Sequence, residues 1–177
     1  MSMGLRVLAA ERRQSQNISL QWTNERLSMD NFVKLEKKTS SEIDQLLRSA
    51  GLAARTADLN QAITLCLKAW ARLPEPKDRW DFYPQIISRG LVEYYTKIGD
   101  KENMEKWIDL TYYAYRDDSR TDIFLNMLEA ECLYKMGIDS RAFDIIAQVE
   151  KVTGKIPPEN LNNASVKAYL NSASIKS

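Results

Sequence analysis

A turn followed by the start of a helix occurs three times along the chain, at nearly equal intervals. The copies occupy residues 57–63, 99–105 and 137–143, and each one follows an apolar helical stretch and begins another. A small or Met residue marks the same point of each copy and recurs at steps of roughly 40 residues; these residues are Ala62, Met104 and Ala142. This interval is typical of stacked helical repeats, in which each repeat buries its apolar face against its neighbours.

The stretches between these turns have the apolar spacing of amphipathic helices. After Asp58, for example, apolar residues follow at steps of three and four, which is the period of a helix; they are Ala62, Leu65, Cys66, Ala69 and Trp70. Nowhere does period-two alternation last long enough to predict a sheet. We therefore predict an all-α fold of about seven to eight helices, arranged as antiparallel hairpins in a short solenoid.

Residues 1–40 are more polar than the rest, and they predict a partly helical N-terminal extension ahead of a helical repeat domain at 41–177. Residues 39–42 match a capping box, in which a hydroxyl and a Glu three residues later satisfy free amide groups. Asp58 and Asp100 are expected to cap later helices. Pro74 is expected to end the second helix and Gly99 the third.

The composition excludes several classes of function. The chain has 25 Lys and Arg against 24 Asp and Glu, a balance that argues against a general nucleic-acid binder. It has no histidine, which removes the commonest general acid/base and metal ligand. Nucleotide-binding glycine motifs and zinc-protease motifs are also absent. We therefore predict no catalytic residues, no metal, no cofactor and no nucleic-acid partner; an enzyme or a cofactor-bound protein is the weakest alternative.

Two cysteines, Cys66 and Cys132, lie far apart, each inside an apolar helical stretch. We expect both to be buried thiols, which behave as small hydrophobic residues. No disulfide framework is indicated, and the short apolar piece at residues 4–10 makes a poor signal peptide. No stretch approaches the length of a membrane span. A cytoplasmic protein without membrane contact is the expectation.

The densest aromatic segment is residues 80–84, Trp-Asp-Phe-Tyr-Pro. Large aromatic side chains usually serve a core, so the favoured interpretation is a plug that seals the first hairpin against the second. Asp81 would then cap the following helix. The alternative is that Asp81 and Tyr83 are presented to a partner.

The turn-and-helix pattern resembles tetratricopeptide repeats over residues 41–156. That family has small residues where the two helices of a hairpin touch, a Gly-Asp-like turn between them, and often a closing proline. The matching residues are Ala62, Ala69, Pro74, Gly99, Asp100, Ala130, Gly137 and Ala142. Met104 and Thr111 depart from the pattern, and the repeats are longer than the family's usual length of about 34 residues.

A narrower resemblance involves residues 73–84 together with Gly99-Asp100 and residues 106–109. These are similar to small bacterial repeat proteins encoded beside polymorphic toxins of the Rhs and contact-dependent type. The resemblance implies an immunity protein, which binds a cognate toxin one-to-one and blocks its active site by steric occlusion. The alternative is a tetratricopeptide adaptor that binds a peptide or helix in its concave groove.

In the tetratricopeptide arrangement, the first helix of each hairpin lines a concave groove. Residues three to four apart share a helix face, and aromatic and Arg residues are enriched at interface anchors. The residues expected to project into the groove are Arg89, Glu93 and Lys97 from the third helix, and Phe124, Met127, Glu131, Tyr134 and Lys135 from the fifth. The alternative is that the charged members only solvate a helix face.

Residues 112–118 form a second candidate surface. They contain three tyrosines, more than one helix face can bury, so at least one is expected to be exposed. Tyr113, Asp117 and Asp118 are the predicted contacts there. An exposed tyrosine beside carboxylates would suit a basic partner, because complementary charge speeds association.

Overall fold

The computed structural model describes residues 32–175. The chain divides into two compact units, residues 1–34 and residues 35–177. Most of the predicted N-terminal extension at 1–40 lies outside the described residues. The unit that begins at Leu35 contains the predicted repeats.

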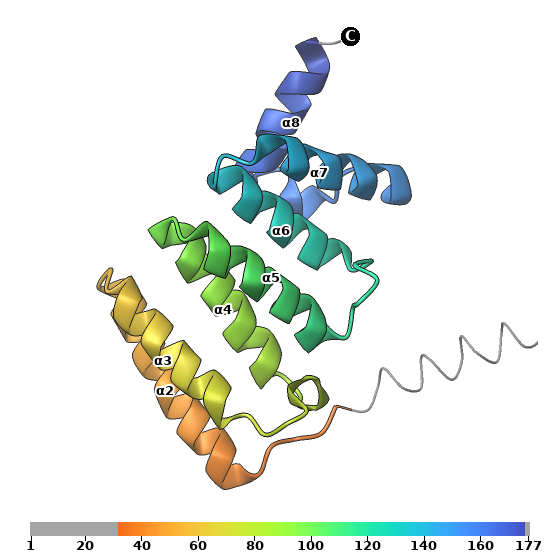
Figure 1. Ribbon diagram of the computed structural model, residues 1–177. Helices are drawn as coiled ribbons and strands as arrows, with labels where there is room; N and C mark the ends of the chain where they lie inside the picture. The colour runs from red at the N-terminus through yellow and green to blue at the C-terminus, as the bar shows by residue number, and fades with distance from the viewer. Residues whose placement is uncertain (1–31, 176–177) are drawn as a thin grey trace, which may run out of the picture. The chain divides into compact units, whose positions relative to one another are not determined.

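Within residues 32–175 the chain forms seven α-helices and no strand, which confirms the predicted all-α class (Figure 1). Two short 3-10 turns, η1 and η2, join some of the helices. The elements are α2 (Lys37–Arg55), α3 (Leu59–Arg72), η1 (Lys77–Arg79), α4 (Tyr83–Ile98), α5 (Lys101–Tyr115), α6 (Ile123–Lys135), α7 (Asp139–Thr153), η2 (Pro158–Asn160) and α8 (Ala164–Ile175).

The helices pair as three consecutive hairpins, α2/α3, α4/α5 and α6/α7, and α8 packs against the last pair. Helix α3 contacts α4, and α6 contacts both helices of the second hairpin. The fifth predicted helix, α6, thus has neighbours on several sides, as its broad apolar surface indicates. The pairing of the helices is observed, and their arrangement as a regular tetratricopeptide-like superhelix stays a prediction.

The predicted turn residues do what their chemistry indicates. The carboxylate of Asp58 accepts a hydrogen bond from the Gln61 backbone N–H at 3.0 Å, and Asp100 does the same for Asn103 at 3.1 Å. Each bond satisfies an amide that the first helical turn leaves free. Gly99 ends α4 with φ 77°, a left-handed conformation that glycine adopts without a Cβ clash.

Two predicted helix caps are wrong. Helix α2 begins at Lys37, ahead of the capping box, and the Ser40 hydroxyl donates back to the Lys37 carbonyl at 3.0 Å. Such back-bonding inside a helix competes with capping. Asp81 does not cap α4, because Phe82 occupies the cap position with φ 67°. Pro84 in the first turn also lacks one of the amides that a capping side chain needs.

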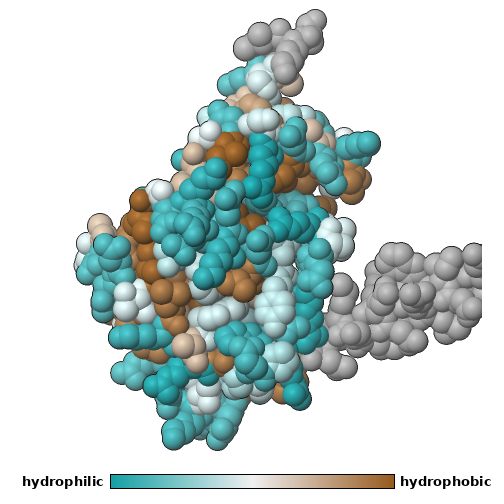
Figure 2. All heavy atoms as spheres, in the orientation of Figure 1, coloured by the Kyte–Doolittle hydropathy of each residue, from teal (hydrophilic) through white to brown (hydrophobic). Residues whose placement is uncertain are grey.

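The hairpins are joined by a buried apolar core in which aromatic residues bridge the repeats. Trp70 of α3 and Trp107 of α5 meet edge to face, with ring centroids 5.1 Å apart. Such pairs add stability beyond the area that they bury. On the face seen in Figure 2, apolar atoms gather between the first two hairpins. The junction between α2/α3 and α4/α5 therefore has an apolar interior, and apolar residues also reach its surface.

Candidate partner-binding groove

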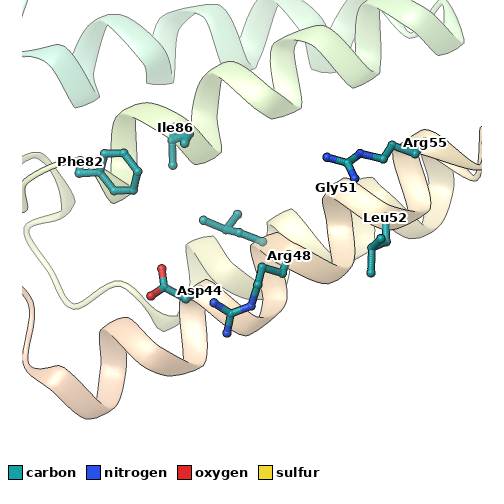
Figure 3. Close-up of a pocket in the computed structure, with 8 residues that line it drawn as sticks. Asp44, Arg48, Gly51, Leu52, Arg55, Phe82 and Ile86 are labelled. Carbon is teal, nitrogen blue, oxygen red and sulfur yellow. The ribbon is translucent and has the colours of Figure 1, made fainter.

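A groove runs between α2 and α4, the first helices of the first two hairpins (Figure 3). Its wider part has a volume of about 500 Å³, and a recess of about 240 Å³ adjoins it. The two parts share Leu47 and Gly51 on α2 and Ile86 on α4. The groove is thus a continuous feature of the surface between these helices.

Large apolar side chains form the walls of the wider part and are open to solvent. The exposed fractions are 61% for Leu52, 54% for Phe82 and 41% for Ile86. Phe82 lies just before α4, opposite Asp44, whereas Leu52 lies further along α2 and its side chain points away from α4 in Figure 3. Contiguous exposed apolar surface of this kind marks protein or ligand contacts in soluble proteins.

Two glycines line the recess from opposite sides. Gly51 lies inside α2 and Gly90 inside α4. A Cβ at Gly51 would have no atom within 4 Å, and one at Gly90 would meet only the Tyr94 ring, at 4.0 Å. A glycine inside a helix costs about 1 kcal/mol relative to alanine. Since packing within the described residues requires neither glycine, their evident effect is to keep the recess open.

The charged residues that line the wider part of the groove differ in whether they have a bonding partner. Asp44 accepts a hydrogen bond from the Tyr83 hydroxyl at 3.0 Å. Arg48 and Arg55 also line this part of the groove, and neither forms an ion pair with any residue in the range 32–175. Figure 3 shows both arginines along α2, with the guanidinium of Arg55 directed toward α4 and that of Arg48 directed away from it. The rim therefore has two guanidinium groups available to a partner.

Arg89 connects the recess to α6. Its guanidinium lies 4.8 Å from the centre of the Phe124 ring, and its Nη1 donates to the Tyr115 hydroxyl at 3.3 Å. Its Nε is buried and has no hydrogen-bond partner in the structure. Cation–π contact with Phe124, which is 49% exposed, extends the mixed apolar and basic surface beyond the groove.

The predicted site residues are dispersed rather than gathered in one groove. Arg89 and Glu93 line the recess between α2 and α4. Lys97 lies further along α4, with its Nζ 5.9 Å from the Tyr94 ring centre. Tyr113 is exposed, as predicted of at least one tyrosine in its run, and its hydroxyl donates to Asp78 at 3.0 Å.

Two predicted surface residues are buried instead. Met127 is 1% exposed and belongs to the core, because α6 has neighbours on several sides. Asp117 is 8% exposed, while Asp118 beside it is exposed. The Asp117 carboxylate accepts backbone N–H groups from Thr121 at 2.9 Å and Asp122 at 2.8 Å. Its role in the structure is to organise the loop before α6.

The predicted contacts at the end of α6 face the C-terminal elements. Glu131 accepts hydrogen bonds from the Ser165 backbone N–H at 3.0 Å and the Ser165 hydroxyl at 2.7 Å, at the start of α8. Burial raises its pKa, but these bonds and the ion pair with Lys135 outweigh that effect and lower it. Tyr134 stacks on Phe143 of α7, with centroids 6.2 Å apart. These residues stabilise the third hairpin and α8.

A buried ion cluster surrounds Glu129 of α6, which sequence reasoning did not identify as special. Its side chain is 4% exposed and pairs with Arg120 at 3.2 Å and Arg141 at 2.8 Å. Arg141 also pairs with Glu105, and Arg120 pairs with Asp109. The acids outnumber the arginines and both guanidinium groups are engaged, so the adjoining hollow of about 290 Å³ is a poor anion site.

The groove residues that sequence reasoning missed left a faint signal. Residues 80–84 place three aromatic side chains in five positions, and short segments rarely bury every one; here Phe82 remains exposed. On α2, Leu52 lies off the face of Ile43 and Ala50, so it is an apolar side chain outside the core face of the helix. Arg48 and Arg55 gave no signal, because surface arginines occur on most helices.

The structure contains no group of three His, Cys, Asp or Glu residues suited to a metal ion within residues 32–175. Across that same range, every helix is too short or too polar to cross a membrane. Both cysteines are buried free thiols, as predicted, and burial raises the pKa of Cys66 to about 11. Comparisons with protein-family models, curated proteins and solved structures find no match to this chain.

Proposed function

We propose that this chain is a protein-binding module, and that the groove between α2 and α4 receives a segment of its partner. The observation that carries the proposal is the pair of glycines at the recess, Gly51 and Gly90, which an isolated helical protein would not need for its own packing. Exposed apolar walls beside them supply the burial that drives association. The module acts by binding and carries out no catalysis.

The narrower form of this proposal is an immunity protein for a cognate toxin, acting one-to-one in the cytoplasm by blocking the toxin's active site. It rests on the resemblance of residues 73–84 to proteins encoded beside Rhs and contact-dependent toxins. Phe82, within that motif, also forms a wall of the groove. That coincidence supports a groove contact with the toxin.

The test of the binding proposal is co-expression with the product of the adjacent gene, followed by isolation of the complex. We expect a stable one-to-one complex that Ile86→Asp or Gly90→Leu disrupts, because one places a charge on the wall and the other fills the recess. Val152→Asp is the matched control, since Val152 is 74% exposed on α7 and lines no part of the groove. Equal binding by all variants would contradict the groove assignment.

Growth distinguishes the immunity form from the adaptor form. An immunity protein should rescue cells that express the adjacent gene, and the Ile86→Asp variant should fail to rescue. A neighbour that is harmless when expressed alone would rule out immunity and leave the adaptor, whose partner segment would then be a peptide or helix of a non-toxic protein.

A further inference from the structure

The rim of the groove indicates the chemistry of its occupant. Arg48 and Arg55 are seven residues apart on α2, which places them on nearly the same helix face, about 10 Å apart along the axis. Both are exposed and line the groove. Arg55 lies in the last turn of α2, where the helix dipole favours a cation, and Arg48 lies mid-helix, one turn after Asp44.

The groove offers these arginines little compensation. Asp44 is the acidic residue lining the wider part, and it accepts the Tyr83 hydroxyl. Glu93 lines the recess, where Arg89 lies beside it. Five charged side chains thus line the two parts, three arginines and two acids, so positive charge is in excess by one. Arg48 and Arg55 are the arginines among them that form no ion pair or ring contact within residues 32–175. An occupant with carboxylates would complete the pairing, whereas a basic one would be repelled.

The shape of the groove favours a helix as the occupant. The walls formed by Leu52, Phe82 and Ile86 suit an apolar stripe, and the recess over the glycines has room for one large side chain. An amphipathic helix presents such a stripe through residues at steps of three, four and seven. Carboxylates seven residues apart beside the stripe would match the spacing of the two arginines.

We infer that the partner segment is an acidic amphipathic helix, with two carboxylates spaced seven residues apart and one large apolar side chain seated over Gly51 and Gly90. This inference rests on the proposed groove function and deepens it. Burial of the apolar stripe provides most of the binding free energy. The two ion pairs determine which partner is preferred.

The test uses the full chain and three designed amphipathic helical peptides of about 18 residues, or five turns. The peptides are identical except at two positions seven apart, which are both Glu, both Gln or both Lys. Fluorescence anisotropy at low salt should show the Glu peptide binding about tenfold more tightly than the Gln peptide, as expected for two partly exposed ion pairs. Added salt should reduce that preference.

Charge reversal provides the decisive comparison. The double variant R48E/R55E should prefer the Lys peptide, because the rim is then acidic; both side chains are exposed, so the fold should be unchanged. The control K68E/K151E makes the same change of net charge at exposed residues that line no part of the groove, and it should keep the preference for Glu.

Other outcomes separate this inference from the proposed function. Equal binding of the three peptides, lost in Ile86→Asp, would retain the groove and overturn the acidic partner. Binding of none of them would overturn the acidic-helix inference, while the groove proposal is decided by the complex with the product of the adjacent gene. If the free chain is a dimer that Ile86→Asp dissociates, the occupant is a second copy and the acidic-helix inference is overturned.

Discussion

Glu129 and Arg141 form an ion pair across the third hairpin, with 2.8 Å between Oε1 of the acid and Nη2 of the base. The carboxylate is almost completely buried, yet the arginine is nearly half exposed. Arg120 approaches the same carboxylate from the preceding loop, and the Tyr112 hydroxyl lies 3.0 Å from its Oε2. The carboxylate of Glu129 on α6 therefore contacts α5, the loop before α6, and α7 at once.

Replacing this carboxylate should destabilise the fold. We expect Glu129→Gln to lower the free energy of unfolding by about 2 kcal/mol, below the usual cost of breaking a buried pair because water can hydrate both arginines. Urea denaturation measures the change. Glu159→Gln, an exposed acid with no ion pair in the described range, should change stability by less than about 0.5 kcal/mol. Similar values for both variants would contradict this stabilising role.

Asp117 should contribute stability that depends on pH. Burial raises its pKa, but hydrogen bonds from Thr121 and Asp122 more than offset this, so the pKa lies below the ordinary value. A carboxyl group whose pKa is depressed by folding stabilises the fold at pH values above its unfolded pKa of about 3.9, and it loses that contribution as the pH falls below that value.

The corresponding variant is Asp117→Asn. We expect it to lose about 1–2 kcal/mol of stability at pH 7, with the difference from the parent chain shrinking below about pH 4. Denaturation at several pH values measures this, with Asp118→Asn as the exposed neighbour control. A difference that is constant with pH would rule out the ionised loop contacts as its source.

A charge-reversal test of the predicted acidic patch should change Asp118 alone, because Asp117→Lys would disrupt the loop.

Replacement by alanine should have opposite effects on stability at a glycine that ends a helix with positive φ and at a glycine inside a helix. Gly99 has φ 77°, so Gly99→Ala should cost about 1–2 kcal/mol through backbone strain. Gly51 lies inside α2 with open space around a Cβ, so Gly51→Ala should stabilise the chain by about 0.5–1 kcal/mol. Thermal unfolding of both variants tests this, and a destabilised Gly51→Ala would show that the glycine serves the fold itself.

The thiols should be unreactive until the chain unfolds. Burial raises the pKa of Cys66 to about 11, so at pH 9 it remains largely a thiol rather than the reactive thiolate. The pKa of Cys132 is raised by the same cause. We expect a disulfide reagent to modify neither cysteine rapidly in the native chain and both in urea. Rapid native labelling that disappears in Cys66→Ser would show that α3 opens locally.

The repeated turns predict the fold well because their chemistry is local. Asp58, Asp100 and Gly99 act through bonds that close within a few residues, so sequence spacing is enough to identify them. Asp81 failed as a cap because Phe82 takes the cap position instead. Similarly, the capping box at residues 39–42 does not cap α2, because the helix begins two residues before it, at Lys37.

The candidate site was less predictable because it depends on which helices come together. Arg89 and Glu93 are four residues apart and share a face of α4, so helical spacing alone is enough to place both at the recess. Met127 shares the helical spacing of its exposed neighbours, but several helices surround α6 and bury it. Glu131 meets α8, which follows it by more than thirty residues and is not part of the repeat.

At Gly51 and Gly90 the shape of the binding recess can change independently of the packing that holds the fold together, whereas at most positions one residue affects both. An alanine at either position would add a methyl group to the recess without displacing a neighbouring side chain of the fold, since almost nothing lies within 4 Å of the added Cβ. Partner choice could therefore be retuned by single substitutions, in nature or by design, while the three-hairpin scaffold stays as it is. The chain is in this sense a ready starting point for a family of binders with different partners.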